Sequence, residues 1–205
     1  MVTIVNYGLG NLGSIQNMLK KIGTRSIISS DYREIEQATK LILPGVGAFD
    51  TGMSRLKELG LIELLNHKVL VEKIPILGVC LGVQLMTKSS QEGKLSGLSW
   101  FNADTVKFDF TNITGKFPLP NMGWRTIDFK KESPLFENLS LNSRFYFVHS
   151  YHLVAANSDD VSMTAEYGYE YAVGLINQNI IGVQFHPEKS HKFGMKFYQN
   201  FVNNF

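Results

Sequence analysis

Short apolar segments alternate with helical patterns up to about residue 97, and this alternation limits the fold more than any other feature. Each apolar segment is rich in β-branched residues or leucine. The strands expected from these segments are residues 2–6 (VTIVN), 25–30 (RSIISS), 40–45 (KLILPG) and 74–79 (IPILGV). Near-continuous apolar strands separated by helices predict an α/β fold, with a mainly parallel sheet covered by helices on both faces.

The helical segments have a clear periodicity. Residues 11–23 (NLGSIQNMLKKIG) carry apolar side chains at helical spacing, with Asn11 suited to the N-cap and Gly23 to the stop. Residues 51–70 (TGMSRLKELGLIELLNHKVL) predict another helical stretch. A final helix is expected over residues 191–205, where phenylalanine recurs every four residues and indicates a core-facing side.

After residue 97 the pattern changes to strands separated by glycine, asparagine and proline, which is typical of β-hairpins. The strand-rich stretches are residues 144–156, 161–168, 171–178 and 180–187. We expect these hairpins to extend or flank the parallel sheet. No repeat or linker divides the chain, so a single domain over residues 1–205 is predicted.

Composition and charge exclude several classes of function. The 205 residues carry a formal net charge of +2 with scattered Lys and Arg, so nothing indicates a nucleic-acid partner. The first residues lack the regions of a signal peptide, and no apolar run has the length of a membrane span. A single cysteine excludes an internal disulfide and suits a reducing compartment. We expect a cytoplasmic protein without a nucleic-acid or membrane partner.

Residues 8–13 (GLGNLG) match the G-x-G-x-x-G pattern of dinucleotide-binding loops, between a predicted strand and a predicted helix. Asp31 follows the second predicted strand, where such sites place an acidic residue for the ribose. The alternative is a tight turn whose glycines let the helix pack closely on the sheet. The motifs that follow favour the tight turn, and we expect no cofactor.

The only cysteine, Cys80, lies in a G-x-C-x-G sequence between an apolar strand and a helical pattern. A nucleophile in such an elbow stands on a sharp turn at the carboxyl edge of the sheet, where the backbone comes close and small neighbours are needed. The amino end of the following helix favours a thiolate, and the N–H of Leu81 can point at an oxyanion. The competing interpretation is a buried, unreactive cysteine.

Residues 182–190 (GVQFHPEKS) offer a base for this nucleophile. His186 and Glu188 are two residues apart at the end of a predicted strand, so extended geometry places both side chains on one face. A cysteine nucleophile requires a base, and the base requires an acidic group on its other ring nitrogen. Alone, His-Pro-Glu favours a surface turn. Together with the elbow, it predicts a Cys80–His186–Glu188 triad.

Residues 41–49 (LILPGVGAF) form a predicted strand that runs into a Pro-Gly-Val-Gly loop. The loop stands at the carboxyl end of a strand that precedes the nucleophile strand, which suits an oxyanion-hole loop. Its glycines allow a peptide to flip and to turn an N–H toward a tetrahedral intermediate. The alternative is a simple turn into the helix that starts near Thr51.

Taken together and in this order, these stretches resemble the class I, triad-type glutamine amidotransferase family, and more closely the glutaminase subunits of imidazole glycerol phosphate synthases. The matching segments are YGLGN, LPGVGAF, GVCLGVQL followed by QEG, PNMGW, FYFVHSY and GVQFHPEKS, spread over nearly the whole chain. PGVG in place of PGG marks this subunit type. The resemblance implies a flavodoxin-like fold and hydrolysis of L-glutamine to glutamate and ammonia. It also implies a heterodimer with a (β/α)8-barrel cyclase subunit, which receives the ammonia and makes imidazole glycerol phosphate and AICAR in histidine biosynthesis.

The resemblance also implies roles residue by residue. Cys80 is the nucleophile, His186 is base and then acid, and Glu188 orients the ring. The N–H groups of Val46 and Leu81 form the oxyanion hole. The residues implied to hold glutamine are Gly47, Gln84, Glu92, Ser150 and Tyr151, with Glu92 opposite the substrate ammonium. The residues implied to face the partner are Gly10, Asn11, Trp124 and Tyr146.

Two departures leave the acceptor of the ammonia open. These subunits usually read PHMGWN where this chain has PNMGWR, with Asn121 and Arg125. The tail KSHKFGMKF also resembles relatives that supply ammonia to a barrel-like sugar amidotransferase in surface-polysaccharide biosynthesis. A further alternative is a thiol hydrolase that acts without any partner. His149 and His152 have no third ligand at suitable spacing, so we expect no metal site.

Overall fold

One large mixed sheet organises the computed structural model, which describes residues 1–205. Its first part consists of parallel strands in the order β2-β1-β3-β4-β13. Their bounds are Val2–Val5 (β1), Ser26–Ser29 (β2), Leu41–Gly45 (β3), Ile76–Cys80 (β4) and Ile180–Val183 (β13). The order 2-1-3-4 is that of flavodoxin-like sheets, so the predicted fold class is confirmed.

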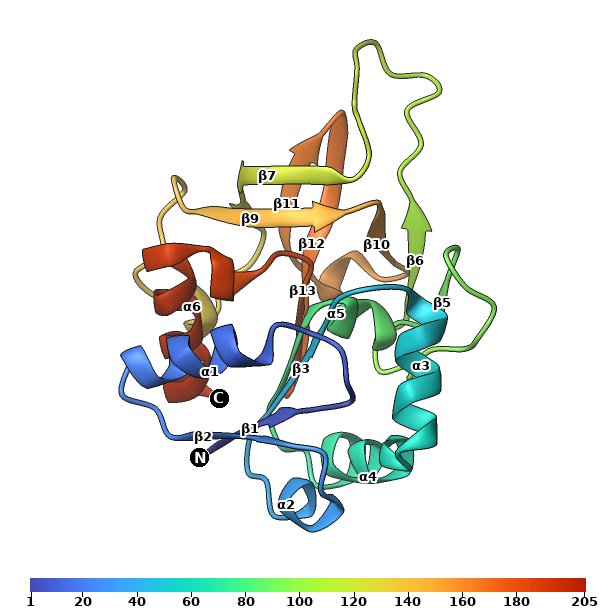
Figure 1. The fold of residues 1–205 in the computed structure, drawn as a ribbon. Helices are drawn as coiled ribbons and strands as arrows, with labels where there is room; N and C mark the ends of the chain where they lie inside the picture. Colours follow the sequence, from blue (N-terminus) through green and yellow to red (C-terminus); the bar gives the residue numbers. More distant parts are fainter.

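Helices cover both faces of these parallel strands (Figure 1). One face carries α1 (Leu12–Lys21) and α6 (His191–Asn204), which pack side by side. The other carries α2 (Tyr32–Glu36), α3 (Phe49–Glu58), α4 (Leu61–Asn66) and α5 (Leu81–Leu85). Each face encloses its own cluster of buried apolar side chains. The helical stretch expected over residues 51–70 is divided at Gly60, which has a φ of +67°, and ends in a π-helical turn (His67–Val71).

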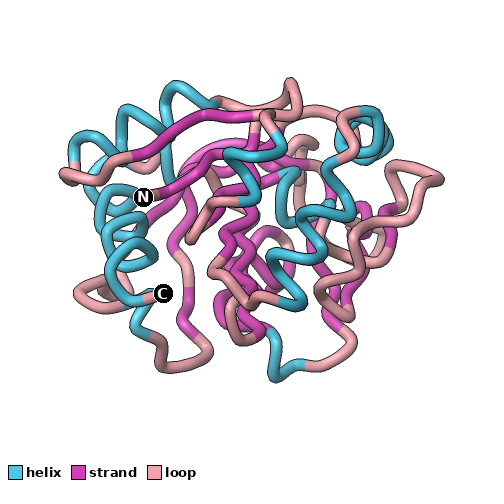
Figure 2. Tube along the Cα trace, turned by 90° about the horizontal axis from the view of Figure 1, so that it is seen from below, coloured by secondary structure: helices cyan, strands magenta, loops and turns pink.

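The start of α1 and the end of α6 differ in whether a side chain bonds the free backbone groups of the helix. Asn11 stands at the N-cap of α1, as predicted, but its side chain makes no capping hydrogen bond. Its backbone (φ −93°, ψ 61°) is not in the extended conformation from which a side-chain oxygen reaches the first turn. At the end of α6, Lys40 donates to the carbonyls of Phe201, Val202 and Phe205. Both chain termini lie on this side of the molecule (Figures 1 and 2), and no helix is both long and apolar enough to cross a membrane.

Antiparallel strands extend the sheet beyond β13, as the hairpin pattern predicted. Their order is β12-β10-β6, with β5 parallel to β6 at the edge. A hairpin joins β11 to β12, and β8 pairs with the outer side of β11. The bounds are Ser89–Ser90 (β5), Ala103–Lys107 (β6), Asp128–Phe129 (β8), Tyr151–Ala155 (β10), Val161–Tyr167 (β11) and Tyr169–Asn177 (β12).

The stretch over residues 144–156 is not one continuous strand, although its two parts extend and flank the main sheet as predicted. The chain breaks at Ser150 into β9 (Arg144–His149) and β10, which belong to different sheets. β9 pairs with β7 (Asn121–Thr126), apart from a single bridge between Tyr146 and His186, and the two strands form a separate ribbon across the end of the main sheet (Figure 1). Phe145 and Phe147 project inward from β9 onto Phe185, and this packing holds the ribbon in place.

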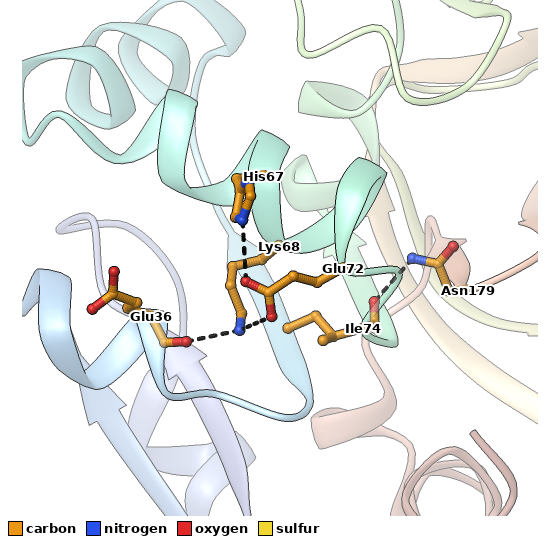
Figure 3. A network of polar contacts seen from close by, with 6 residues as sticks. All are labelled: Glu36, His67, Lys68, Glu72, Ile74 and Asn179. Carbon is orange, nitrogen blue, oxygen red and sulfur yellow. Dashed lines mark hydrogen bonds and ion pairs between the residues drawn. The ribbon is translucent and has the colours of Figure 1, made fainter.

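A polar network fixes the opposite, amino-terminal edge of the parallel strands (Figure 3). Lys68 is buried in the π-helical turn and donates to the carbonyl of Glu36 at 2.7 Å and to the carboxylate of Glu72 at 2.5 Å. Asn179, in the turn before β13, donates to the carbonyl of Ile74, just before β4, at 2.9 Å. These bonds hold the starts of β4 and β13 together and leave the carboxyl edge free for a site.

Candidate active site

The carboxyl ends of three adjacent parallel strands bring the sequence motifs together. In the pairing of β3 with β4, Gly45 is opposite Cys80, and in the pairing of β4 with β13, Val79 is opposite Val183. Cys80 therefore stands between the Pro-Gly-Val-Gly loop and the His-Pro-Glu segment. Ligands of open parallel sheets bind at this edge.

Cys80 has the geometry of a nucleophile elbow. Its positive φ of 55° with ψ −111° costs on the order of 1–3 kcal/mol for a residue with a side chain. A Cβ on Gly78 would collide with the side chain of Met86, and a Cβ on Gly82 would collide with the carbonyl oxygen of Leu43. The two glycines of the G-x-C-x-G sequence are thus required by the close approach of helix α5 to the sheet.

His186 and Glu188 form a buried hydrogen-bonded pair, with Nδ1 2.8 Å from Oε1. They meet for a different reason than the sequence suggested. Glu188 lies in a 3₁₀ turn (Pro187–Lys189) rather than in extended chain, and the turn brings its carboxylate back onto the ring. Ser190 fixes this turn, because its hydroxyl donates to the carbonyl of His186 at 2.6 Å and accepts from the N–H of Tyr146 at 3.0 Å.

The neighbours of His186 decide its protonation state. Burial alone lowers the pKa of this imidazole, but its interactions with the neighbouring Cys80 and Glu188 outweigh burial and raise the pKa to about 10. Nε2, the nitrogen that Glu188 does not use, has no hydrogen-bond partner. The ring is therefore charged at neutral pH and has one nitrogen available for the reaction.

These motifs enclose a pocket of about 280 Å³. The sequence-predicted residues that line it are Val46, Gly47, Cys80, Leu81, Gln84, Glu92, Ser150, Tyr151 and His186. Glu188 is the one proposed member of the triad, oxyanion hole or glutamine site outside this lining, because it lies behind His186. Pro120, Val148 and His149 complete the wall.

Comparison with known proteins agrees with this geometry. The sequence profile of the family described as "Glutamine amidotransferase class-I" matches residues 3–205. The chain belongs to the class I glutamine amidotransferase family. It is 55% identical over 98% of both chains to "Imidazole glycerol phosphate synthase subunit HisH 2" of Methanococcus maripaludis, and 43% identical over 98% of both chains to the protein of that name from Pseudomonas aeruginosa. A crystal structure of a glutamine amidotransferase shares the fold, with a TM-score of 0.71 at 18% identity over 98% of this chain and 96% of that one.

In this glutamine amidotransferase, Gln184 also contacts the nucleophile, although no sequence motif indicated it. The residue follows β13 and is fully buried. Its Nε2 donates to the sulfur of Cys80 at 3.7 Å, and its Oε1 accepts from Nε2 of Gln84 at 3.0 Å. A glutamine at the end of an otherwise apolar strand was the available signal, because a buried amide requires partners.

Glu92 lies at the rim of the pocket. Its Oε2 accepts from the N–H of Phe49, the first residue of α3, at 2.9 Å, and its Oε1 has no protein partner. Asp50 holds the loop that carries Glu92, because its carboxylate accepts from the N–H groups of Lys94 and Leu95. These backbone hydrogen bonds lower the pKa of Asp50. The glutamate is thus fixed with one oxygen free.

The two histidines of the FVHSYH sequence have protein partners. His149 is buried in the pocket wall, a place that its position beside Ser150 could have suggested. Its Nδ1 is 2.7 Å from the carbonyl oxygen of Tyr151. His152 lies outside the pocket, with Nε2 2.9 Å from the hydroxyl of Tyr169. No group of three or more His, Cys, Asp or Glu side chains is placed to hold a metal ion.

The glycine loop near the amino terminus packs as a tight turn. A Cβ on Gly10 would lie 3.2 Å from the side chain of Pro44, at the start of the Pro-Gly-Val-Gly loop. Asp31 caps α2, because its carboxylate accepts from the N–H groups of Arg33 and Glu34. The carboxylate that a dinucleotide site needs is thus engaged locally, which supports the tight-turn interpretation.

Trp124 and the half-buried Tyr146 form a cross-strand pair on the β7–β9 ribbon, with ring centroids 6.2 Å apart. Trp124 is 39% exposed and stacks on His191 at 5.5 Å. Met122, two residues earlier on the same side of β7, is 57% exposed. We call the surface formed by Met122, Trp124, Tyr146 and His191 the aromatic face.

Proposed function

We propose that this chain is the glutaminase subunit of an imidazole glycerol phosphate synthase, acting as a single glutamine amidotransferase domain. It hydrolyses L-glutamine and passes the ammonia to a (β/α)8-barrel cyclase subunit, which makes imidazole glycerol phosphate and AICAR in cytoplasmic histidine biosynthesis. The observation that carries the proposal is the arrangement of Cys80, His186 and Glu188 at one pocket. Full-length relatives named as this subunit support the pathway.

In the first half-reaction, the sulfur of Cys80 attacks the side-chain amide carbon of glutamine. His186 holds the thiol proton on Nε2 and delivers it to the amide nitrogen, so the C–N bond breaks and ammonia leaves. A thioester of glutamate remains on Cys80. Glu188 accepts from Nδ1–H throughout and stabilises the imidazolium.

In the second half-reaction, water attacks the thioester carbon. His186 takes a proton from the water and returns it to the departing sulfur, which releases glutamate. The oxyanion of both tetrahedral intermediates accepts from the N–H of Leu81 and, after the Pro-Gly-Val-Gly peptide turns, from the N–H of Val46. Val46 is 42% exposed at the pocket, so this peptide has room to turn. The reaction requires neither metal nor cofactor.

Glutamine is held at its amino-acid end, away from the reacting carbon. The free oxygen of Glu92 binds the substrate ammonium as a charge-assisted hydrogen bond. The backbone at Ser150 and Tyr151, together with Gly47 and the side chain of Gln84, forms the remaining contacts. A rim carboxylate thus favours a free amino acid over an amide within a peptide.

The partner docks on the aromatic face and on the neighbouring Gly10 and Asn11. Exposed aromatic residues such as Trp124 are typical anchors of protein interfaces. Tyr146 also donates its N–H to Ser190 and accepts from the N–H of His186 at its carbonyl, so this interface lies directly on the base loop. Docking at this surface and positioning of the base are therefore physically connected.

The inward position of Asn121 favours the histidine-pathway cyclase over a sugar amidotransferase as partner. Asn121 is fully buried and Arg125 lies on the same inner side of β7. The departure from the usual PHMGWN sequence therefore changes the interior behind the pocket and not the aromatic face. A sugar amidotransferase remains the second candidate, on the resemblance of the tail.

The test is glutamate release from L-glutamine by the purified chain, alone and with each candidate barrel protein loaded with its acceptor. We expect strong stimulation by the histidine cyclase only, and no glutamate from the Cys80→Ala variant under any condition. Stimulation by the sugar-amidating barrel alone would assign the chain to surface-polysaccharide biosynthesis. Full activity without a partner would favour an independent thiol hydrolase, and the absence of Cys80-dependent glutamate in every mixture would refute the glutaminase assignment.

A further inference from the structure

A chain of polar groups runs inward from the pocket wall: the carbonyl of Tyr151, His149, Asn121 and Arg125. Asn121 on β7 is the register partner of His149 on β9, so the two side chains meet between the strands. Arg125 is one of the two residues that depart from the usual sequence of these subunits, and Asn121 is the other. They are four residues apart on the same side of β7 and hydrogen-bonded to each other.

The partners of His149 define its tautomer. Nδ1 lies 2.7 Å from the carbonyl oxygen of Tyr151, and a carbonyl only accepts, so Nδ1 carries the hydrogen. Nε2 lies 3.2 Å from Nδ2 of Asn121, and an amide nitrogen only donates, so Nε2 is the acceptor. The ring is therefore neutral and held at both nitrogens.

The orientation of the Asn121 amide is fixed in turn by Arg125. Its Oδ1 accepts from Nε of Arg125 at 3.1 Å and from Nη2 at 2.9 Å. A guanidinium has no acceptor, so the amide oxygen must face it and the amide nitrogen must face the opposite way. That nitrogen also donates to the hydroxyl of Tyr171 at 2.9 Å. Arg125 is itself held over the ring of Tyr167, with 4.8 Å from its guanidinium carbon to the ring centroid.

The groups around His149 agree with a neutral ring. The pKa of His149 is lowered to about 3, mainly by burial; the hydrogen bond to Tyr151 opposes this shift, and the neighbouring His152, His186 and Arg125 add to it. The hydroxyl of Tyr171 is 3.4 Å from Nε2. The rings of Phe108 and Phe147 pack against the imidazole, and no carboxylate is hydrogen-bonded to it.

We propose that Asn121 and Arg125 are a pair of positioning residues that hold His149 as the neutral Nδ1–H tautomer against the carbonyl of Tyr151, and so fix the wall to which glutamine binds. The role in glutamine binding rests on the proposed function. Each member of the pair requires the other, which accounts for the departure at both positions. Arg125 lies outside the pocket lining and has no hydrogen bond to His149. Its hydrogen bonds reach the histidine through Asn121, and its positive charge acts in the same direction by disfavouring a charged ring.

The decisive variant is Asn121→Asp, which keeps the shape of the side chain and its bonds to Arg125. Its second oxygen replaces a donor by an acceptor opposite Nε2, so His149 must take up a second proton. We expect ¹⁵N NMR of the wild-type chain at pH 7 to show one protonated Nδ1 and one bare Nε2 for His149, and the variant to show two protonated nitrogens. An Nε2–H tautomer in the wild type, or an unchanged spectrum in the variant, would overturn the proposal.

Kinetics of glutamine hydrolysis with the stimulating partner test the consequence. Because the wall holds the substrate away from the reacting carbon, we expect Asn121→Asp to raise KM on the order of 10²-fold while kcat changes by only a few-fold. Arg25→Gln is the control, since Arg25 is exposed and far from the pocket. An unchanged KM would overturn the part of the proposal that concerns the pocket.

A double-mutant cycle tests whether Arg125 acts through Asn121. We expect Arg125→Met to raise KM, and the Asn121→Ala/Arg125→Met variant to be no worse than Asn121→Ala alone. Additive losses would show that Arg125 acts by another route and would contradict the pairing. The NMR measurement needs no substrate, so it tests the tautomer of His149 even if the wild-type chain releases no glutamate. The absence of glutamate would reject the proposed function and would leave the tautomer result valid.

Discussion

Two walls of one pocket each carry a buried histidine, and the two rings differ in protonation state: one is charged and the other is neutral. His186 on the base loop has a carboxylate 2.8 Å from Nδ1, and its pKa is raised to about 10. His149 on the facing wall has a backbone carbonyl at Nδ1 and an amide at Nε2, and its pKa is lowered to about 3. Both side chains are almost completely buried.

The difference shows that burial alone does not determine the pKa of a histidine in this pocket. Burial lowers the pKa of both rings, and only negatively charged neighbours reverse the direction at His186. Neutral dipoles hold His149 in place without charging it. The pocket therefore has one charged ring that can transfer protons and one neutral ring that keeps its wall in shape.

Removing the carboxylate is the strongest way to break this contrast. Glu188→Gln keeps an acceptor of similar shape but removes the charge, so the pKa of His186 should fall toward that of His149. Loss of the oriented imidazolium should lower kcat by about 10²–10⁴-fold. Both quantities are measurable, by NMR titration of His186 and by glutamate release with the stimulating partner.

Glu63→Gln is the matched control for this substitution, because Glu63 is exposed on α4 and far from the pocket. It should leave the pKa of His186 and kcat unchanged. A Glu188→Gln variant that retains both a raised His186 pKa and near wild-type kcat would show that Cys80 alone sustains the imidazolium.

The pH dependence of stability sharpens the comparison, because the two histidines act in opposite directions. Between pH 6.5 and about 10, folded His186 keeps a proton that the unfolded chain has lost, so the free energy of unfolding decreases as pH rises. Between pH 6.5 and about 3, the unfolded chain protonates His149 while the folded chain does not, so the free energy of unfolding decreases as pH falls. Each slope reaches at most about 1.4 kcal/mol per pH unit.

Urea unfolding of wild type, His186→Asn and His149→Asn across this pH range separates the two contributions. We expect His186→Asn to flatten the alkaline limb only and His149→Asn to flatten part of the acidic limb only. The difference from wild type isolates each ring from the carboxylates that also titrate in acid. Identical limbs in all three proteins would mean that neither ring changes its proton affinity on folding.

The sequence predicted the first half of this molecule better than the second, for a physical reason. The parallel strands and their helices carry local periodicity, and the G-x-C-x-G elbow requires glycines at fixed positions. In the second half, by contrast, the partner with which each strand pairs depends on residues that are far away in the sequence. The chain over residues 144–156 has one continuous β pattern, yet Phe145 and Phe147 pack on Phe185 and draw β9 out of the main sheet.

Within the site, residues that belong to a recognisable sequence motif were easier to predict than residues whose role depends on contacts formed only after folding. Cys80, His186 and Glu188 stand in recognisable sequences, although the 3₁₀ turn that joins the last two has no clear sequence signal beyond Pro187. Gln184 and His149 matter because of what lies opposite them after folding. Their partners, Cys80 and Asn121, come from other strands.

Two buried tyrosines provide the test with the smallest expected effect, because they compare a hydrogen-bonded with an unpaired neutral hydroxyl. The hydroxyl of Tyr7 is fully buried and has no hydrogen-bond partner, and burial together with the charge of Cys80 raises its pKa. The hydroxyl of Tyr171 accepts from Asn121 at 2.9 Å. A buried polar group is costly only when it is left unpaired.

Tyr7→Phe should therefore leave the free energy of unfolding unchanged or raise it by up to about 1 kcal/mol, because it removes a hydroxyl that gains nothing in the folded chain. Tyr171→Phe should lower it by about 0.5–1.5 kcal/mol, because it removes a hydrogen bond and leaves the Asn121 amide with one partner fewer. Urea midpoints at pH 7 compare the two variants directly. A loss of stability in Tyr7→Phe equal to that in Tyr171→Phe would show that the Tyr7 hydroxyl is hydrogen-bonded in solution. This hydroxyl lies close to Gly45 of the Pro-Gly-Val-Gly loop, where an added Cβ would collide with it.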